Sequence, residues 1–259
     1  ASVQAGNMST LNAPEEVYLA EKLIEMHPWA DMARFARSGG EANAIAIRIA
    51  RAASGKDNVA ICGYHGWHDW YLAANLGDDN QLAGHLLPGL DPKGVPQNLR
   101  GTVYTFNYNN YAELEGLVAK YDIGVIKMEV VRNQGPQNNF LQKVRDLATR
   151  LGIVLIFDEC TSGFRQTFGG IHKIYGVEPD MAMFGKALGN GYAVTATIGR
   201  REIMENAQST FISSTFWTER IGSSAALKTL EVMERERSWE RITETGAGIM
   251  ASWQKLGKK

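Results

Sequence analysis

The sequence has few cysteines, little net charge and no long apolar segment. Cys62 and Cys160 are the only two cysteines among 259 residues, and both lie in or beside apolar runs. This excludes a disulfide framework and favours a reducing cytoplasm. The formal net charge is −1, so there is no electrostatic footprint for nucleic acid or an anionic membrane. Because no apolar stretch is long enough to span a bilayer, we expect neither partner.

What the chain does have is enough apolar residues for one large core. Hydrophobic residues make up 44% of the sequence, and a chain of this length leaves room for a second, smaller domain. The most informative apolar run covers residues 153–157 and reads as a buried parallel strand. Asp158 and Glu159 follow it directly. In open α/β sheets this carboxyl end is where ligands bind.

A second apolar run, residues 180–184, delivers Gly185 and Lys186 to the same edge if the connection is the usual crossover. A lysine and an aspartate that face one cavity have two interpretations. One is a plain buried ion pair. The other is a site for pyridoxal phosphate, whose aldehyde condenses with a lysine while a carboxylate keeps its ring nitrogen protonated.

Two further segments could complete such a site. Residues 38–43 (SGGEAN) lead from a short strand into a helix, so their backbone N–H groups could bind an anion or simply form a tight turn. Residues 63–70 (GYHGWHDW) follow a buried strand and offer a flat aromatic face. The histidines and Asp69 in this segment also raise the alternative of a metal site, although no further cluster completes the shell.

Four segments follow one another along the chain: SGGEANAIAIRIAR, GYHGWHD, FDECTSGFR and FGKALGNGY. In the order and approximate spacing of these segments the chain resembles the class III aminotransferases, which depend on pyridoxal phosphate. The resemblance is strongest to their glutamate-1-semialdehyde aminomutase branch. The resemblance implies an α/β protein of PLP-dependent transferase fold type I. Its large domain would have a mostly parallel, seven-stranded sheet flanked by helices.

The same resemblance assigns roles to individual residues. Lys186 would form a Schiff base with the cofactor and then shuttle the proton, and Asp158 would hold the ring nitrogen protonated. Tyr64 and Cys160 would lie on the two faces of the ring. The phosphate would be bound by the first residues of the helix that starts after the glycine turn, Ser38, Gly39 and Gly40.

The resemblance is less direct at two further positions. Glu129 ends a predicted strand at 123–128, where relatives have a Glu-Pro pair followed by an amide that binds the phenolic oxygen of the cofactor. Val130 replaces that proline, so either Asn133 or Gln134 could be the amide, and we favour Gln134. Thr215 would reach the phosphate of the other subunit in a homodimer with shared active sites, or it could simply cap the next helix.

The expected activity is transfer of an amino group between small amino and keto or aldehyde compounds, or an internal transfer of the aminomutase type. Residues 1–235 are expected to form the cofactor-binding large domain, without the N-terminal family segment. Residues 236–259 would begin a truncated small C-terminal domain. A fragment that binds the cofactor without catalysing a reaction is the remaining alternative.

Overall fold

The computed structural model describes residues 4, 6, 11–77, 81–86, 88–131 and 133–257. A seven-stranded sheet lies at its centre, in the order β1-β7-β6-β5-β4-β2-β3. Only β7 runs against its neighbours, β1 and β6, and the other pairings are parallel. The strands are β1 (Met32–Ala36), β2 (Asn58–Cys62), β3 (Val103–Thr105), β4 (Ile123–Glu129), β5 (Val154–Asp158), β6 (Met181–Phe184) and β7 (Thr195–Gly199).

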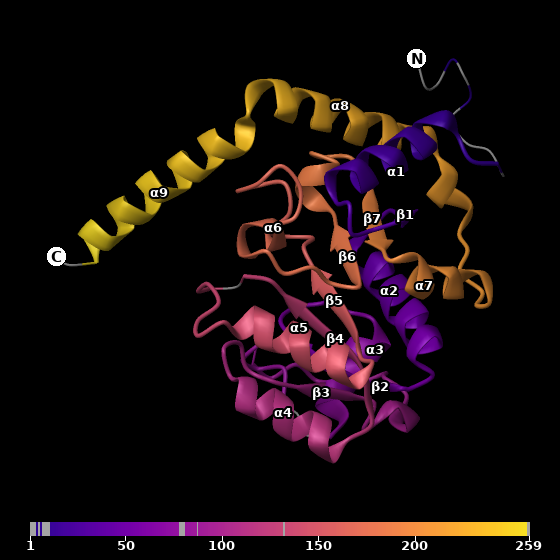
Figure 1. Ribbon diagram of the computed structural model, residues 1–259, viewed down its shortest axis with the longest axis vertical. Helices are drawn as coiled ribbons and strands as arrows, with labels where there is room; N and C mark the ends of the chain where they lie inside the picture. Colours follow the sequence, from indigo (N-terminus) through magenta and orange to yellow (C-terminus); the bar gives the residue numbers. More distant parts are fainter. Residues whose placement is uncertain are drawn as a thin grey trace.

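The sheet is covered by helices on both faces (Figure 1). The α-helices are α1 (Pro14–Met26), α2 (Gly39–Ser54), α3 (Asp69–Leu72), α4 (Tyr111–Lys120), α5 (Phe140–Leu151), α6 (His172–Tyr175), α7 (Arg201–Met204), α8 (Arg220–Glu236) and α9 (Ser238–Leu256). Short 3-10 turns are η1 (Ala73–Leu76), η2 (Gln97–Leu99), η3 (Lys186–Leu188), η4 (Glu205–Gln208) and η5 (Thr215–Thr218).

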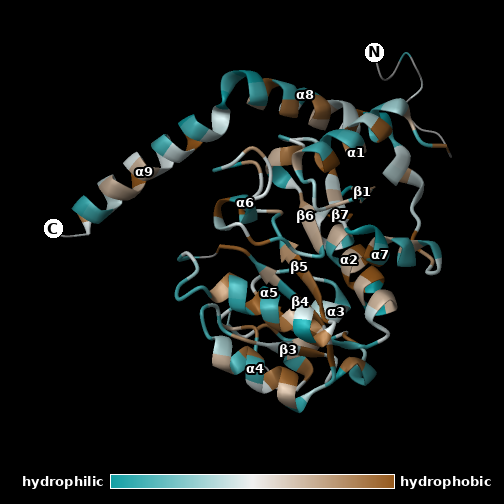
Figure 2. Cartoon of the chain, viewed as in Figure 1, coloured by the Kyte–Doolittle hydropathy of each residue, from teal (hydrophilic) through white to brown (hydrophobic). Residues whose placement is uncertain are grey.

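Three apolar clusters hold these layers together. One lies between α2 and a sheet face that includes Ile61, Val125 and Ile156. The opposite face, with Ile126 and Phe157, packs on α4 and α5. A third cluster joins α1 and α8 to β1, β6 and β7. Figure 2 agrees with this division, since β5 and β6 are drawn in brown tones whereas α5 alternates between teal and brown.

Local sequence signals explain where the longer helices start and stop. Ser38 and Glu41 form a reciprocal capping box at the start of α2. Gly55 and Gly152 end α2 and α5 in the left-handed conformation, which a residue without Cβ adopts easily. The expected mostly parallel, seven-stranded sheet flanked by helices is confirmed.

Two parts of the chain differ from the sequence expectation. The glycines and prolines of the segment 81–97 predict a long surface loop, yet Leu82 and His85 are buried, and His85 accepts a hydrogen bond from the N–H of Gly63. Helix α9 was not predicted as a helix, and it projects away from the sheet (Figure 1), with none of its described residues buried. Among the described residues, no helix combines the length and apolarity needed to cross a membrane.

Candidate active site

Six strands, β1 to β6, have their carboxyl ends at one edge of the sheet. Strands β2, β4, β5 and β6 run parallel, and the register pairs Glu129 with Asp158 and Asp158 with Met183. Strand β1 points the same way, because both it and β6 are antiparallel to β7. The segments that follow these strands therefore lie together, and they contain most of the predicted site residues.

Asp158 ends β5 and is only 5% exposed. Its Oδ2 accepts a hydrogen bond from Nδ1 of His65 at 2.9 Å and lies 3.8 Å from Nζ of Lys127. Its Oδ1 accepts from the backbone N–H of Cys160 at 3.1 Å. Burial alone would raise the pKa of Asp158, but Lys127 and these hydrogen bonds hold that pKa well below its usual range. The site therefore contains a buried carboxylate that stays ionised.

Lys186 follows β6 and does not pair with that carboxylate. Its Nζ donates a hydrogen bond to Oγ1 of Thr161 at 2.6 Å, and its side chain is exposed. Among the described residues, the ion pairs of Asp158 are with His65 and Lys127. The interpretation of Asp158 and Lys186 as a plain buried ion pair is therefore wrong, and the lysine amine remains accessible.

The backbone at Lys186 is also unusual. Its φ of +43° lies in the left-handed region, which costs a residue with a Cβ about 1–2 kcal/mol. The residue opens the short turn η3 directly after Gly185, and its carbonyl accepts a hydrogen bond from the N–H of Asn190. Strain of this kind concentrates at functional sites, where the surrounding structure enforces it.

Cys160 lies between the aspartate and the lysine segments. A Cβ built on Gly185 would lie 3.6 Å from its Sγ. Burial raises the pKa of the Cys160 thiol well above its usual range, so the residue behaves as a small apolar group and not as a nucleophile. Both cysteines are buried and neither forms a disulfide, as the sequence predicted.

The aromatic loop after β2 crosses the start of α2. A Cβ on Gly66 would lie 3.2 Å from Cα of Gly40, and one on Gly40 would lie 2.9 Å from Nε2 of His68. The backbone N–H of Tyr64 donates to Oε2 of Glu129 at 3.2 Å, and its ring is 41% exposed. The loop thus lies against the glycine turn through Gly66, Trp67 and His68.

The start of α2 has free donors for an anion. Glu41 already accepts from the backbone N–H groups of Arg37 and Ser38. The N–H groups of Gly39 and Gly40 belong to the first helical turn, where no intrahelical acceptor exists. A Cβ on Gly39 would meet nothing within 4 Å. The helix start is therefore open at Gly39, whereas a side chain at Gly40 would have to displace the imidazole of His68.

The two weaker assignments have different surroundings. Glu129 ends β4 beside Asp158 and binds the Tyr64 backbone, so it lies within the cluster. Gln134 and Asn133 are exposed in the loop after β4, and Oε1 of Gln134 accepts from Nε2 of Gln137 at 3.0 Å. These contacts give no reason to prefer one amide, so the choice of Gln134 stays a prediction.

Thr215 opens the short turn η5 and is exposed. Helix α8 is capped instead by Glu219, whose side chain accepts from the N–H groups of Ile221 and Gly222. The alternative that Thr215 caps the next helix is therefore wrong. Arg37 holds this segment against the body through the carbonyl of Trp217 at 2.7 Å and the carboxylate of Glu219 at 2.9 Å.

The metal alternative rested on His65, His68 and Asp69. His65 is turned toward Asp158, while His68 lies against Gly40. Over the described ranges, no three His, Cys, Asp or Glu side chains form a group that could hold a metal ion.

The geometry can be compared with known proteins. The family model described as aminotransferase class-III matches residues 2–259. The chain belongs to this family. It is 37% identical over 247 residues to 3-aminobutyryl-CoA aminotransferase of Cloacimonas acidaminovorans, covering 92% of this chain and 56% of that protein. It is 35% identical over 252 residues to glutamate-1-semialdehyde 2,1-aminomutase of Methanothermobacter thermautotrophicus, covering 93% and 58%.

Solved structures give the same fold. An omega-transaminase from Sphaerobacter thermophilus superposes with a TM-score of 0.78 at 27% identity, over 89% of this chain and 56% of that one. The Sphingopyxis FumI protein, in its PLP internal aldimine form, gives 0.86 at 24% identity over 99% and 60%. This class III chain thus spans about 56–60% of the length of these relatives.

Three site residues of this class III chain escaped sequence reasoning. His65 was considered only as a metal ligand, although it bonds to Asp158. Lys127 lies inside the predicted strand 123–128 and Thr161 inside the FDECTSGFR segment, and neither was given a role. Lys127 contacts Asp158, and Thr161 contacts Lys186. A lysine inside an otherwise apolar run was a usable signal for Lys127, because lysine is almost never fully buried without a partner.

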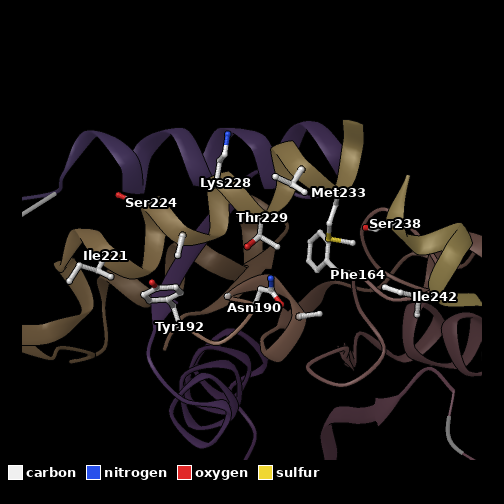
Figure 3. Close-up of a pocket in the computed structure, with 14 residues that line it drawn as sticks. Phe164, Asn190, Tyr192, Ile221, Ser224, Lys228, Thr229, Met233, Ser238 and Ile242 are labelled. Carbon is white, nitrogen blue, oxygen red and sulfur yellow. The ribbon is translucent and has the colours of Figure 1, made fainter. Parts of the chain in front are cut away.

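A separate hollow lies beside the segment that follows Lys186 (Figure 3). Its volume is about 810 Å³, and neither Asp158 nor Tyr64 lines it. Asn190 and Tyr192 form one wall, and residues of α8 such as Thr229 and Met233 form the other. The hollow therefore borders the lysine segment without containing the carboxylate, and it is distinct from the cluster described above.

Proposed function

We propose that this chain is the cofactor-binding part of a pyridoxal-phosphate-dependent aminotransferase. It would move an amino group between a small amino compound and a keto or aldehyde compound. The observation that carries the proposal is one edge of the sheet that presents an ionised, buried Asp158 and an accessible Lys186 that are not paired with each other. Family membership supports it.

The residues present fit this cofactor. When bound, pyridoxal phosphate withdraws electrons from the carbon that bears the substrate amine. Asp158 would accept a hydrogen bond from the ring nitrogen and keep it protonated, which an ionised carboxylate can do. The amine of Lys186 would be the attachment point for the aldehyde and later move the proton. Tyr64 and Cys160 would pack against the two opposite faces of the cofactor ring.

The remaining assignments concern the polar groups of the cofactor. The N–H groups of Gly39 and Gly40, with the hydroxyl of Ser38, would bind the phosphate at the positive end of α2. Glu129 would order the Tyr64 loop, since it binds the backbone of that residue. Gln134 would supply the amide for the phenolic oxygen. The positions described above support the roles of Ser38, Gly39, Gly40 and Glu129, whereas the choice of Gln134 over Asn133 rests on the resemblance alone.

Internal transfer within one substrate is the second candidate reaction. The 35% identity to glutamate-1-semialdehyde 2,1-aminomutase favours it, whereas the 37% identity to 3-aminobutyryl-CoA aminotransferase favours transfer between two substrates. Turnover with an amino donor, measured with and without a keto acceptor, separates the two. Because the chain spans little more than half of these relatives, a form that binds the cofactor without turnover is the third outcome.

We also propose a homodimer with shared active sites, in a reducing cytoplasm. The segment around Thr215 supports the dimer, because Phe211 and Phe216 are 81% and 63% exposed while Arg37 holds the segment in place. Large exposed aromatics on an ordered segment are typical of interfaces. The two buried cysteines, neither of which forms a disulfide, are compatible with a reducing compartment.

The division into residues 1–235 and 236–259 remains a proposal as well. The first range would be the large, cofactor-binding domain. The second would begin a smaller one, an assignment supported by α9, which has no buried residue among those described. Limited proteolysis would test it, since cleavage should fall first near Arg237, at the junction of α8 and α9.

Borohydride reduction tests the proposed function. The protein saturated with pyridoxal phosphate should become permanently labelled on the peptide that contains Lys186. A Lys186→Ala variant should take up no label, and Lys228→Ala, an exposed lysine on α8, is the matched control that should label normally. Label on another lysine, or no label on a folded protein, would show that the assignment is wrong.

Subunit mixing tests the shared site. Thr215→Ala should weaken cofactor retention about tenfold or more, because a hydrogen bond to a charged phosphate contributes about 1.5–3 kcal/mol. A Lys186→Ala subunit mixed with a Thr215→Ala subunit should then rebuild one site in which both residues are intact. A monomer that nevertheless retains the cofactor tightly would contradict the shared site.

A further inference from the structure

Lys127 is a fully buried lysine in the middle of β4. Its neighbours in register are Ile61 on β2 and Ile156 on β5, and both belong to the apolar layer under α2. Its Nζ lies 2.9 Å from Sδ of Met183 and 3.8 Å from Oδ2 of Asp158. An ammonium group in this layer is costly, since removing a charge from water is repaid only by a well-placed opposite charge.

The surroundings of Lys127 identify that opposite charge. Asp158 is the only acid within ion-pair distance of its Nζ among the described residues. Glu129, two residues farther along β4, acts on it more weakly and also binds the Tyr64 backbone. The other titratable groups that face the pair are His65, which donates to Asp158, and Cys160, whose N–H does the same.

Structural stability alone does not explain a lysine at this position. The residues before it, Val125 and Ile126, are aliphatic and fully buried, so a methionine or isoleucine would fill the same layer without desolvating a charge. Replacing buried ion pairs by apolar side chains is often neutral or even stabilising. The cost of the ammonium group is understandable if its benefit lies at Asp158, beside the ligand.

We propose that Lys127 is a positioning residue, whose buried ammonium keeps the carboxylate of Asp158 ionised and fixed in orientation for the ligand that reaches it. The role of that ligand rests on the proposed function, but the pair itself exists in the protein without cofactor. Without Lys127, the partners of Asp158 among the described residues would be His65 and the Cys160 N–H. Burial would then favour the protonated acid, which lacks the negative charge that keeps a ring nitrogen protonated.

The direct test is a carboxyl ¹³C NMR titration of the cofactor-free protein, with Asp158→Asn used to assign the signal. In the wild type Asp158 should stay ionised down to strongly acidic pH. In Lys127→Met its titration midpoint should rise by about 1–3 pH units, the usual effect of a neighbouring charge. Lys143→Met removes an exposed lysine on α5 and should leave the midpoint unchanged. Equal midpoints in wild type and Lys127→Met would overturn the proposal.

The reciprocal titration covers the case in which Lys127→Met does not fold. In protein labelled with ¹³C at lysine Cε, Asp158→Asn should lower the midpoint of Lys127, because the buried ammonium loses the charge that offsets its desolvation. An unchanged Lys127 midpoint would overturn the proposal just as firmly. Neither titration involves the cofactor, so failure of the proposed function would leave these results standing.

The loaded enzyme gives the functional readout. Lys127→Met should lower kcat about tenfold or more and leave the substrate KM nearly unchanged, because it disturbs the ring partner and not the substrate contacts. Lys127→Arg, which keeps the charge, should recover part of kcat. A change in KM alone, or equal losses in the Met and Arg variants, would assign Lys127 to packing instead.

Discussion

Asp158 and Glu159 are neighbouring buried acids at the end of β5, but their side chains have different hydrogen-bond partners on opposite sides of the sheet. Asp158 faces the α2 side of the sheet, where it meets His65, Lys127 and an N–H group. Glu159 is fully buried on the other side. It accepts four hydrogen bonds, from the N–H groups of Ile171 and His172, from Nδ1 of His172 and from the hydroxyl of Ser162.

The network around Glu159 continues away from the site. Nε1 of Trp29 donates to Nε2 of His172 at 3.0 Å, so the proton of that ring is on Nδ1, where Glu159 accepts it. Nε2 of His27 accepts from the N–H of Gly170 at 3.0 Å. Glu159 thereby fixes the segment between β5 and α6 to the body. Of two adjacent carboxylates, Glu159 therefore serves the fold, and Asp158 is the one for which we propose a ligand.

The largest effect on stability is expected from Glu159→Gln. In the glutamine side chain an N–H₂ group replaces one carboxylate oxygen, and this group cannot accept the hydrogen bonds that the oxygen accepted. Two buried hydrogen bonds are therefore lost, which should lower the free energy of unfolding by about 3–5 kcal/mol. Denaturant unfolding should show this loss, while the folded fraction still binds the cofactor. Unfolding at the wild-type midpoint would show that the network contributes little.

This contrast was only partly visible in the sequence. The apolar runs predicted β5 and β6, and therefore the edge at which Asp158 and Lys186 meet, because strand periodicity is a local property. The partners of the two acids could not be predicted, since Trp29 and His27 are 143 residues away from His172 and Gly170. Contacts over such separations depend on how the layers pack, which one sequence does not reveal.

The converse effect is expected from Asp158→Asn, which should retain the fold and the cofactor but lose most activity. Loss of a charge-assisted hydrogen bond in a dry site raises the transition-state free energy by about 2–4 kcal/mol, or roughly 30- to 1000-fold in rate. Steady-state kinetics on cofactor-saturated protein would measure it. Turnover close to that of the wild type would refute the role of Asp158.

The pH dependence of the free energy of unfolding should report on His27, which belongs to the network around Glu159. Burial lowers the pKa of His27 from 6.5 to about 4. Above pH 6.5 the His27 ring is neutral in both the folded and the unfolded protein. Between pH 6.5 and about 4 the ring binds a proton in the unfolded chain but stays neutral in the folded protein. Stability should therefore fall through this window, by up to about 3 kcal/mol from His27 alone.

His27→Gln is the matched variant for this experiment. Glutamine can still accept from the Gly170 N–H but does not titrate, so the decline between pH 6.5 and about 4 should flatten. Urea unfolding at several pH values would measure the difference. Parallel profiles for wild type and variant would show that His27 is not the group responsible.

The protonation state of the cofactor's ring nitrogen tests most directly whether Asp158, and not Glu159, is its partner. With ¹⁵N-labelled pyridoxal phosphate bound, the chemical shift of the ring nitrogen should report a protonated ring at neutral pH in the wild type and in Glu159→Gln. It should report an unprotonated ring in Asp158→Asn. If the two variants give the same shift, Asp158 is not the partner of the ring nitrogen and the distinction drawn between these carboxylates fails.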